Sequence, residues 1–600
     1  MEAAGHAVAA VADPARAPAG PGPRLTPPVL APGFEHAPPA PPASAPGSGH
    51  APPAPPALAP GFEHTPPTPP TLAPGLEHAP PTGRFLARAT LVTASLSVAA
   101  ALLGLVRDQS LARLFGAGRD TDAFLVAWTV PEFAATLLIE DGLAFALIPA
   151  FSRALARRAQ GAPGDPVRAL VAGTLPRLTL SFAAVGALLA LAAPQFVAVL
   201  APGLPDPALA VDCTRLTATC VLSFGLAGYF SAALRAHRRF LAPAAIYIVY
   251  NVGIVTAMYT LGGRWGVRSA AFGVAAGGCL MMLVQLPSLL PRLRRRAREG
   301  EAKAVAEAAR PMDVPLLASV LLFALCRQSQ VLIERFLASG LPSGAISHLN
   351  YAQKVAQIPM TLSMMLCTVT FPVVARALAD GDTERARDRV ERDLALAAAL
   401  VLLGTAAVVA CAPQLIGLLF QRGAFTAEDT AATAAVMRVY AFGLLGQTLT
   451  GVLVRSYFSA GRAAWYPVAA MAAGIVATSW IGTWSVDAWG VTGIAAANAT
   501  GITLTAALLL AGTGPRSVPI RTGPVLRELS RPLRAAVVAA VAGGLVAALP
   551  SGPLAGLAAG GATVTAVFVL LAWALGVQDL APALRSVRTL TRRLAHAVFR

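Results

Sequence analysis

The chain has 600 residues, of which 56% are hydrophobic and only 13% are charged, and its mean hydropathy is +0.62. These values lie outside the range of soluble globular proteins and indicate a protein with many membrane-spanning segments. The net charge of +17 comes almost wholly from arginine, and arginines placed between apolar segments favour a membrane-topology signal over a nucleic-acid-binding surface. The six cysteines include no CxxC pair and lie in or beside apolar segments, which argues against a zinc site or a disulfide framework.

Residues 1–83 have a different composition from the rest of the chain. The sequence LAPGFEH, or a variant of it, begins at residues 30, 44, 58 and 72, so it recurs every 14 residues among Pro-Pro and Ala-Pro steps. This pattern predicts a disordered, proline-rich cytoplasmic tail. No charged segment followed by an apolar stretch opens the chain, so we expect no signal peptide. A metal site is the less favoured alternative, because expansion of a repeat explains the spacing of the four repeat histidines, His36, His50, His64 and His78.

From residue 85 onward, apolar segments predict about fourteen transmembrane helices. Pro131 and Pro359 fall inside the second and the eighth of them, where the missing backbone N–H permits a bend. The expected fold class is an all-α polytopic membrane protein. The predicted segments are 87–106, 121–150, 172–193, 210–234, 241–262, 268–290, 314–338, 346–375, 393–412, 431–455, 464–484, 488–512, 534–549 and 553–576.

Arginines occur in alternate connections between these segments. The connections near 160, 237, 300, 388, 462 and 520 carry arginine, whereas those near 203, 342, 486 and 551 contain no Lys or Arg. The positive-inside rule therefore predicts a protein of the cytoplasmic membrane with both termini in the cytoplasm. One outer connection breaks the pattern, because RDQSLARLFGAGRDTDAF at 107–124 places several charges between two apolar segments.

Three pairs of short motifs recur at nearly constant spacing. IPAFSRAL at 148 resembles FPVVARAL at 371, APQFVAVLAPG at 193 resembles APQLIGLLFQRG at 412, and SFGLAG at 223 resembles AFGLLG at 441. The offsets of 223, 219 and 218 residues superpose six helices on six, which predicts two parallel six-helix lobes around a central cavity. The expected domains are an N-terminal lobe at 84–295, a basic cytoplasmic linker at 296–313, a C-terminal lobe at 314–515, two extra helices at 516–580 and a basic amphipathic tail at 581–600.

Charged residues at membrane depth are the candidates for function, because a charge in hydrocarbon costs about 2.5–3.5 kcal/mol or more and needs a partner or a wet cavity. The repeat puts Arg107 and Lys354 on facing walls, where two cations suit an anionic cargo. For the acidic residues Asp108, Asp122 and Glu140, pairing within the protein is the alternative to cargo contact. No phosphate-binding loop or metal-ligand motif occurs, so we expect a transporter rather than an enzyme, with no cofactor.

Several of these stretches resemble a known family. GLVRDQSLARLFGAGRDTDAFLVAWTVPEF is similar to the first-to-second span region of the MurJ/MviN family, the lipid II flippases of peptidoglycan synthesis. HLNYAQKVAQIP followed by FPVVARAL resembles the family's eighth span, and LLFQRGAFTAEDT resembles its ninth-to-tenth connection. The resemblance covers about residues 85–515. It implies the fold of the multidrug/oligosaccharidyl-lipid/polysaccharide exporter superfamily, with two lobes around a cationic cavity and two extra helices that form a lipid-side groove.

The resemblance also carries site residues over, position by position. Arg107 and Asp108 match the family's first-span Arg-Asp pair, and Asp122 matches its Thr-Asp-Ala-Phe aspartate. Glu140 matches its second-span glutamate, and Lys354 stands where its eighth span has arginine. All five are therefore expected to bind the cargo. The chain departs from the family at three positions where arginine is frequent, which are Ala101, Ala135 and Thr136.

The function implied by the resemblance is that of a flippase. It would move an undecaprenyl-pyrophosphate-linked peptidoglycan precursor, lipid II, by alternating access, with the pyrophosphate on Arg107 and Lys354. Because three arginines are missing, two alternatives stay open: a flippase for another lipid-linked saccharide, and a transport-deficient scaffold that recruits cell-wall synthesis proteins through its cytoplasmic tails. The expected partners are a lipid-linked anionic oligosaccharide and membrane lipids, without nucleic acid.

Overall fold

The computed structural model of the protein describes residues 83–140, 142–161, 164–294, 314–364, 382–458, 465–514 and 520–577. Within these ranges the regular elements are helices and no strand occurs, which confirms the predicted all-α fold class. The predicted N-terminal tail up to residue 82, the basic linker and the basic C-terminal tail lie outside the described ranges.

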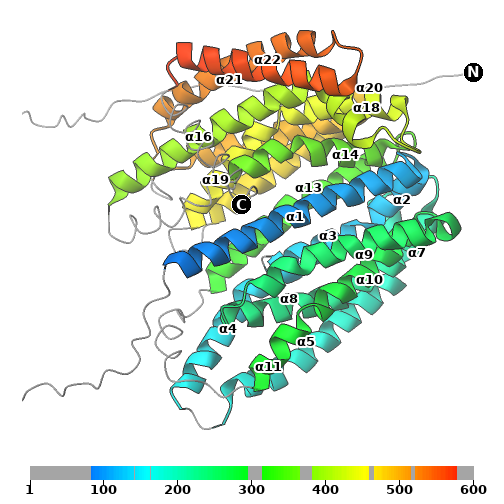
Figure 1. Ribbon diagram of the computed structural model, residues 1–600, viewed down its shortest axis with the longest axis vertical. Coiled ribbons are helices and arrows are strands. Elements are labelled where there is room, and N and C mark those ends of the chain that lie inside the picture. Colours follow the sequence, from blue (N-terminus) through cyan, green and yellow to red (C-terminus); the bar gives the residue numbers. More distant parts are fainter. Residues whose placement is uncertain are drawn as a thin grey trace, which may run out of the picture. The chain divides into compact units, whose positions relative to one another are not determined.

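The first half of the described chain contains eleven α-helices and one π-helix, which is called η1. They are α1 (Gly83–Phe115), α2 (Arg119–Ala127), α3 (Thr129–Ala134), η1 (Ala135–Glu140), α4 (Gly142–Ala159), α5 (Pro166–Leu191), α6 (Ala193–Leu200), α7 (Pro207–Ala218), α8 (Cys220–Ala236), α9 (Leu241–Trp265), α10 (Arg268–Leu283) and α11 (Leu286–Arg294). Among them, α9 packs against both α10 and α1, and α8 packs against α4, α5 and η1 (Figure 1).

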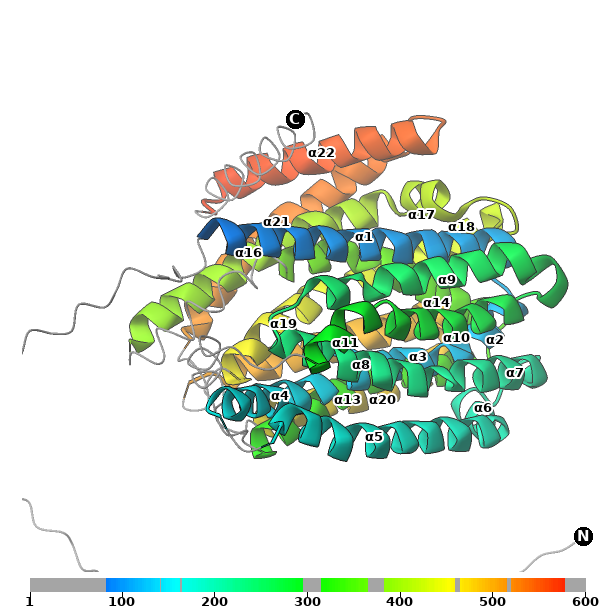
Figure 2. The same ribbon diagram turned by 60° about the horizontal axis from the view of Figure 1, so that its bottom comes forward.

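The second half continues with longer helices. They are α13 (Val314–Ala338), α14 (Ala345–Ala356), α16 (Thr383–Ala410), α17 (Ala412–Phe420), α18 (Ala427–Ala441), α19 (Leu444–Phe458), α20 (Trp465–Ala511), α21 (Thr522–Ala547) and α22 (Pro553–Ala574). The pair α21 and α22, drawn in orange and red, packs together and against α16 (Figure 2).

Many of these helices are suited to a membrane. Nine helices of the described part of the chain are long and apolar enough to cross a bilayer, and α18 with α19, bent by 45° at their junction, would form a tenth crossing. One of the nine, α20, is 47 residues long and changes direction at Gly490. The protein is therefore a multi-pass membrane protein, and the number of fourteen crossings stays a prediction.

Four exposed tryptophans lie at or near helix ends or beside the bend in α20. Trp265 ends α9 and Trp489 precedes the bend in α20, whereas Trp465 begins α20 and Trp573 lies in the last turn of α22. Their exposed fractions range from 47% to 80%. Tryptophan at both ends of apolar helices is typical of the two membrane interfaces, where one part of the ring meets lipid and the N–H meets water.

The two halves repeat each other in their irregularities. Both α6 and α17 begin with Ala-Pro-Gln directly after a break in the preceding helix, as the paired motifs predicted. The structure adds a further pair, because Gly266 between α9 and α10 has φ 55° and ψ −141°, and Gly490 inside α20 has φ 53° and ψ −132°. Only glycine adopts this backbone conformation readily. These two glycines are 224 residues apart, close to the motif offsets, which supports the predicted parallel repeat.

Helix breaks also occur at the two prolines that the sequence singled out. The break between α2 and α3 falls at Trp128, three residues before Pro131, and α14 ends at Ala356, three residues before Pro359. Proline cannot donate the backbone hydrogen bond of a continuous helix, so a break one turn earlier is its expected effect. Each proline therefore follows a helix break by about one turn.

Candidate functional site

Arg107 is fixed by groups from three segments. Its guanidinium donates two hydrogen bonds to Asp108 Oδ1, from Nε at 3.0 Å and from Nη2 at 2.8 Å. Nη1 donates to Asn251 Oδ1 of α9 at 3.1 Å, and the guanidinium carbon lies 4.5 Å from the centre of the Trp128 ring. The side chain is only 14% exposed, so an ion pair and a cation–π contact replace water around the charge.

Lys354 reaches the same place from the second half of the chain. It lies in α14 and lines a small cavity together with Arg107, Asp108 and Asn350. The cavity has a volume of about 10 Å³, which is room for about one water molecule and too little for a phosphate group. Lys354 forms no hydrogen bond or ion pair with any residue that the structure describes. The two predicted cations therefore meet at one cavity, which is closed around them in this conformation.

A second cavity, with a volume of about 440 Å³, lies beside Glu140. The Oε1 atom of Glu140 accepts a hydrogen bond from the Tyr247 hydroxyl at 2.8 Å. Asn251, one helical turn along α9 from Tyr247, lines this cavity and also accepts the hydrogen bond from Arg107. Glu140 and Arg107 thus belong to two cavities that are linked through Asn251, which lines the cavity beside Glu140 and binds Arg107 of the other. We call them the large cavity, beside Glu140, and the small cavity, between Arg107 and Lys354.

The position of Glu140 depends on close packing of the π-helix. A Cβ atom added at Gly228 of α8 would lie 1.9 Å from the carbonyl oxygen of Leu138, and one at Gly142 would lie 2.3 Å from that of Leu137. No larger residue fits at either position without movement of the backbone. A π-helical turn widens the helix and redirects the side chain at its end, which here is Glu140 at the large cavity.

Asp122 lies in α2 and binds the N-terminus of α14. Its Oδ2 accepts from the backbone N–H of Gly344 at 2.6 Å, and its Oδ1 accepts from the backbone N–H and the hydroxyl of Ser347 at 2.8 and 2.5 Å. A carboxylate at this position satisfies free N–H groups and faces the positive end of the helix dipole. Asp122 lines neither cavity, and the pairing with Arg107 that the sequence allowed is absent.

A second contact between the halves joins α3 to α13. Arg335 Nη2 donates to Glu132 Oε2 at 2.9 Å, and Nη1 donates to the Thr129 hydroxyl. The two charged side chains are 7% and 25% exposed, so the pair is largely shielded from water. Sequence reasoning missed Glu132, although an acidic residue directly after Pro131 in an apolar segment is a signal of the same kind as Glu140.

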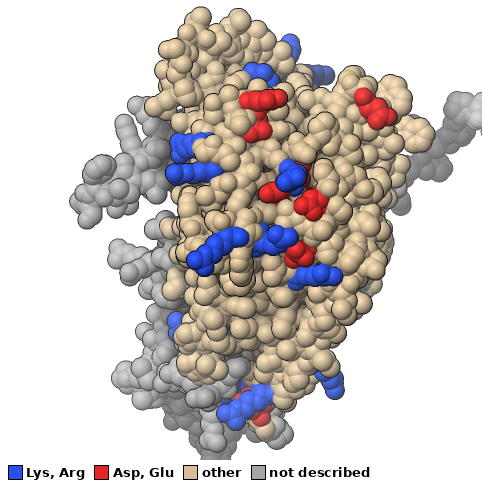
Figure 3. Space-filling view, turned by 90° about the vertical axis from the view of Figure 1, so that its right-hand side faces the viewer, with Lys and Arg blue, Asp and Glu red and all other residues tan. Residues whose placement is uncertain are grey.

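Turns at one end of the molecule also join the first and second halves of the described chain. We call the contact region between these halves the seam. Ala424 N–H donates to the Arg113 carbonyl at 2.9 Å. Gly116 and Gly423, with φ of 70° and 66°, lie so close to the opposite turn that added Cβ atoms would lie 2.7 Å from the Ala424 oxygen and 2.3 Å from the Arg113 oxygen. We call this the Gly116 end. Figure 3 faces it and shows basic and acidic side chains near one another on a mostly uncharged surface.

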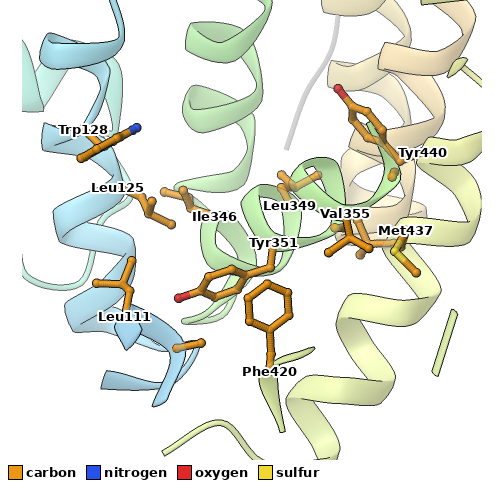
Figure 4. Close-up of a cluster of buried hydrophobic side chains, with 14 of the residues drawn as sticks. Leu111, Leu125, Trp128, Ile346, Leu349, Tyr351, Val355, Phe420, Met437 and Tyr440 are labelled. Atoms are coloured by element: carbon orange, nitrogen blue, oxygen red, sulfur yellow. The ribbon is translucent and has the colours of Figure 1, made fainter. Parts of the chain in front are cut away.

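Buried side chains fill the seam below these turns. Figure 4 shows Ile346, Leu349, Tyr351 and Val355 of α14 between Leu111, Leu125 and Trp128 on one side and Phe420, Met437 and Tyr440 on the other. The rings of Tyr351 and Phe420 are 4.9 Å apart between centroids. The seam is therefore apolar and closed between the small cavity and the Gly116 end.

Comparison with known proteins identifies the family. The family described as lipid II flippase MurJ matches residues 111–558. The chain belongs to this family. The lipid II flippase MurJ of Burkholderia cenocepacia is 27% identical over 391 residues, which cover 62% of this chain and 73% of that one. The probable lipid II flippase MurJ of Bdellovibrio bacteriovorus is 28% identical over 386 residues, with coverage of 62% and 71%.

Solved structures share the fold. The structure of a lipid II flippase MurJ in an inward closed conformation superposes with a TM-score of 0.64 at 16% identity, and covers 82% of this chain and 100% of that one. An inward-facing multidrug resistance transporter of the MATE family in the MOP superfamily gives a TM-score of 0.54 at 14% identity, with coverage of 70% and 95%. The MurJ family and the exporter fold predicted from the motifs are both confirmed.

Proposed function

We propose that this protein moves lipid II across the cytoplasmic membrane by alternating access between its two halves. The convergence of Arg107 and Lys354 on one cavity, from helices that are far apart in sequence, is the observation that carries the proposal. Both cations suit the pyrophosphate of a lipid-linked precursor, and membership of the MurJ family supports this cargo. The small cavity must widen before it can hold that group, so binding requires movement of α14 relative to α1.

Within this site the predicted residues take different roles. Arg107, Lys354 and Glu140 line cavities and contact the cargo, with Glu140 facing its sugar hydroxyls. Asp108 orients the Arg107 guanidinium through two hydrogen bonds. Asp122 acts through α14, whose N-terminus it binds, and is therefore a positioning residue for Lys354 on the same helix.

The orientation we propose has the Gly116 end outside and both termini in the cytoplasm. Arginine-bearing connections between spans support it through the positive-inside rule. Contacts between the halves at the Gly116 end then close the outer side, and the large cavity, which reaches the connection at Arg235 and Phe240, faces the cytoplasm. Cargo enters the large cavity first and reaches Arg107 and Lys354 when the small cavity opens.

Depletion of the protein in its own bacterium tests the function. A lipid II flippase leaves the precursor accumulating on the inner leaflet, where an externally added enzyme or probe cannot reach it until the cells are lysed. The purified protein should also carry a co-purifying prenyl-pyrophosphate lipid in native mass spectrometry. Depletion that displaces cell-wall enzymes without precursor accumulation would instead establish the scaffold alternative. A different co-purified glycolipid would establish the alternative of a flippase for another lipid-linked saccharide. The absence of arginine at Ala101, Ala135 and Thr136 favours that alternative.

A further inference from the structure

The large cavity contains a basic side chain that has no role in the site described so far. Arg235, in the last turn of α8, lines the cavity together with Glu140, Tyr247 and Asn251. Ala101 of α1 lines it as well, so the wall formed by α1 contributes no charge at that position. Arg235 is thus a cation in the same space as the carboxylate of Glu140.

Arg235 is half-buried and forms no hydrogen bond or ion pair with the residues that the structure describes. Two other arginines near the helix connections have carboxylate partners, which are Asp165 for Arg158 at 3.3 Å and Glu384 for Arg387 at 2.9 Å. A guanidinium has five N–H donors in a fixed planar arrangement, and partial burial without a partner leaves them available to an anion. The carboxylate that lines the same cavity, Glu140, already accepts a hydrogen bond from Tyr247.

The chemistry of the surrounding wall indicates what kind of molecule fits. Hydroxyls of Thr93 and Ser97, the amide of Asn251 and the phenol of Tyr247 surround the two charges. Such groups bind sugar and peptide polar groups, and a volume of about 440 Å³ is within the range of small-molecule sites. The cavity therefore suits the hydrophilic part of a cargo that carries an anionic group within reach of Arg235.

We infer that Arg235 is a further cargo-binding residue, which holds an anionic group of the lipid-linked cargo in the large cavity before the pyrophosphate reaches Arg107 and Lys354. The inference rests on the proposed lipid II flippase function. The anionic group is either a phosphate of the prenyl-pyrophosphate or a carboxylate of the attached peptide, and both accept charge-assisted hydrogen bonds from a guanidinium. Arg235 binds and orients the cargo and has no chemical step to perform.

Binding to the purified full-length protein in detergent tests the inference, with lipid II and unsubstituted undecaprenyl pyrophosphate as the two probes. Arg235→Ala should weaken lipid II binding about 10- to 100-fold, the loss expected for a charge-assisted hydrogen bond. An equal loss for undecaprenyl pyrophosphate assigns the contact to phosphate. A loss confined to lipid II assigns it to a carboxylate. Arg235→Lys should retain part of the affinity, because the charge remains and the planar donor geometry is lost.

Two further variants separate cargo contact from charge and folding. Arg157→Ala removes an exposed arginine near the end of α4 that lines neither cavity, and should bind lipid II as the unmodified protein does. Arg235→Ala combined with Ala101→Arg returns a cation to the large cavity from α1 and should regain most of the lost affinity. Recovery in this double variant also shows that the loss in Arg235→Ala was not a folding defect.

The outcomes also distinguish this inference from the proposed function. Unchanged binding of both lipids by Arg235→Ala, together with lost binding by Arg107→Ala, would overturn the role of Arg235 and leave the flippase function in place. Equal losses in Arg235→Ala and Arg157→Ala would overturn it too, because net charge alone would then explain them. Absence of lipid II binding by the unmodified protein would overturn both proposals.

Discussion

The Gly116 end and the large cavity use polar groups in opposite ways. At the Gly116 end, Asp122 is saturated by three hydrogen bonds from the N-terminus of α14, and the turns meet through backbone groups. At the large cavity, Arg235 has no partner among the described residues and Glu140 is exposed. Polar groups thus satisfy one another at the Gly116 end, whereas the large cavity keeps a guanidinium whose N–H groups remain available. In the proposed mechanism, the Gly116 end is closed while the large cavity is open to the cargo, and this contrast fits that arrangement.

The small cavity lies between these regions and has features of both. Arg107 uses three of its five N–H donors on Asp108 and Asn251, whereas Lys354, across the same 10 Å³ space, has no partner among the described residues. The largest expected effect on transport comes from substitutions at the small cavity. Arg107→Ala or Lys354→Ala should abolish complementation of a depletion strain, because each removes charge-assisted hydrogen bonds to the pyrophosphate.

Immunoblots of membrane fractions should show normal amounts of both alanine variants. Lys354→Arg should complement, because the charge is kept and a bidentate fork is gained. Growth of either alanine variant at the normal rate would remove the small cavity from the transport mechanism.

The next largest effect is expected from disruption of the ion pair between Glu132 and Arg335. This change tests whether an ion pair helps to hold the two halves together at the Gly116 end. Glu132→Gln removes the ion-pair partner of Arg335, whose side chain is only 7% exposed. Removal of one partner of a fully buried pair costs about 3–5 kcal/mol, and the partial exposure of Glu132 reduces this to about 2 kcal/mol. The balance of conformations should therefore shift roughly 30-fold away from closure at the Gly116 end.

Spin labels at Arg119 and Glu428, which are exposed residues of α2 and α18, report this shift as a longer distance by electron paramagnetic resonance. Glu384→Gln is the matched control. The side chain of Glu384 is 82% exposed, and its ion pair with Arg387 lies within α16 and does not join the halves. Identical distance distributions for Glu132→Gln and the unmodified protein would mean that the apolar seam alone holds the halves together.

A smaller effect on transport is expected from substitution of Asp122. Its variants distinguish a residue that holds α14 in place from one that contacts the cargo. Asparagine has one acceptor oxygen where the Asp122 carboxylate uses two, so Asp122→Asn can keep the hydrogen bonds from Ser347 and loses the one from Gly344, whereas Asp122→Ala loses all three. If Asp122 acts through α14, transport in a lipid II flipping assay should be moderately slower in Asp122→Asn and several-fold slower in Asp122→Ala. Equal loss in both variants would show that the charge itself is required, as for a cargo contact.

No effect on transport is expected from deletion of the N-terminal repeats. Their composition is too poor in packing residues to fold alone, so deletion of residues 1–80 should leave insertion and flipping unchanged. Flipping rates in proteoliposomes of the full-length and shortened proteins provide the comparison. Lost flipping with normal insertion would favour a role of the tail in recruiting partners.

The sequence by itself determined the membrane class, the helix breaks one turn before Pro131 and Pro359, and the repeat of the two halves. Each of these follows from local chemistry, namely apolar length or a missing N–H, or from motifs at constant spacing. The meeting of Arg107 with Lys354 was also predictable, because the repeat places their helices on facing walls.

Only the tertiary structure decided which charges pair across the halves and which remain free. Asp122 binds Gly344, 222 residues away, and Glu132 binds Arg335, 203 residues away, whereas Arg235 faces a cavity. These outcomes depend on how each helix is rotated about its own axis. In a membrane span nearly every face is apolar, so hydropathy sets where a helix lies along the chain and carries almost no information about which side chains it turns toward its neighbours.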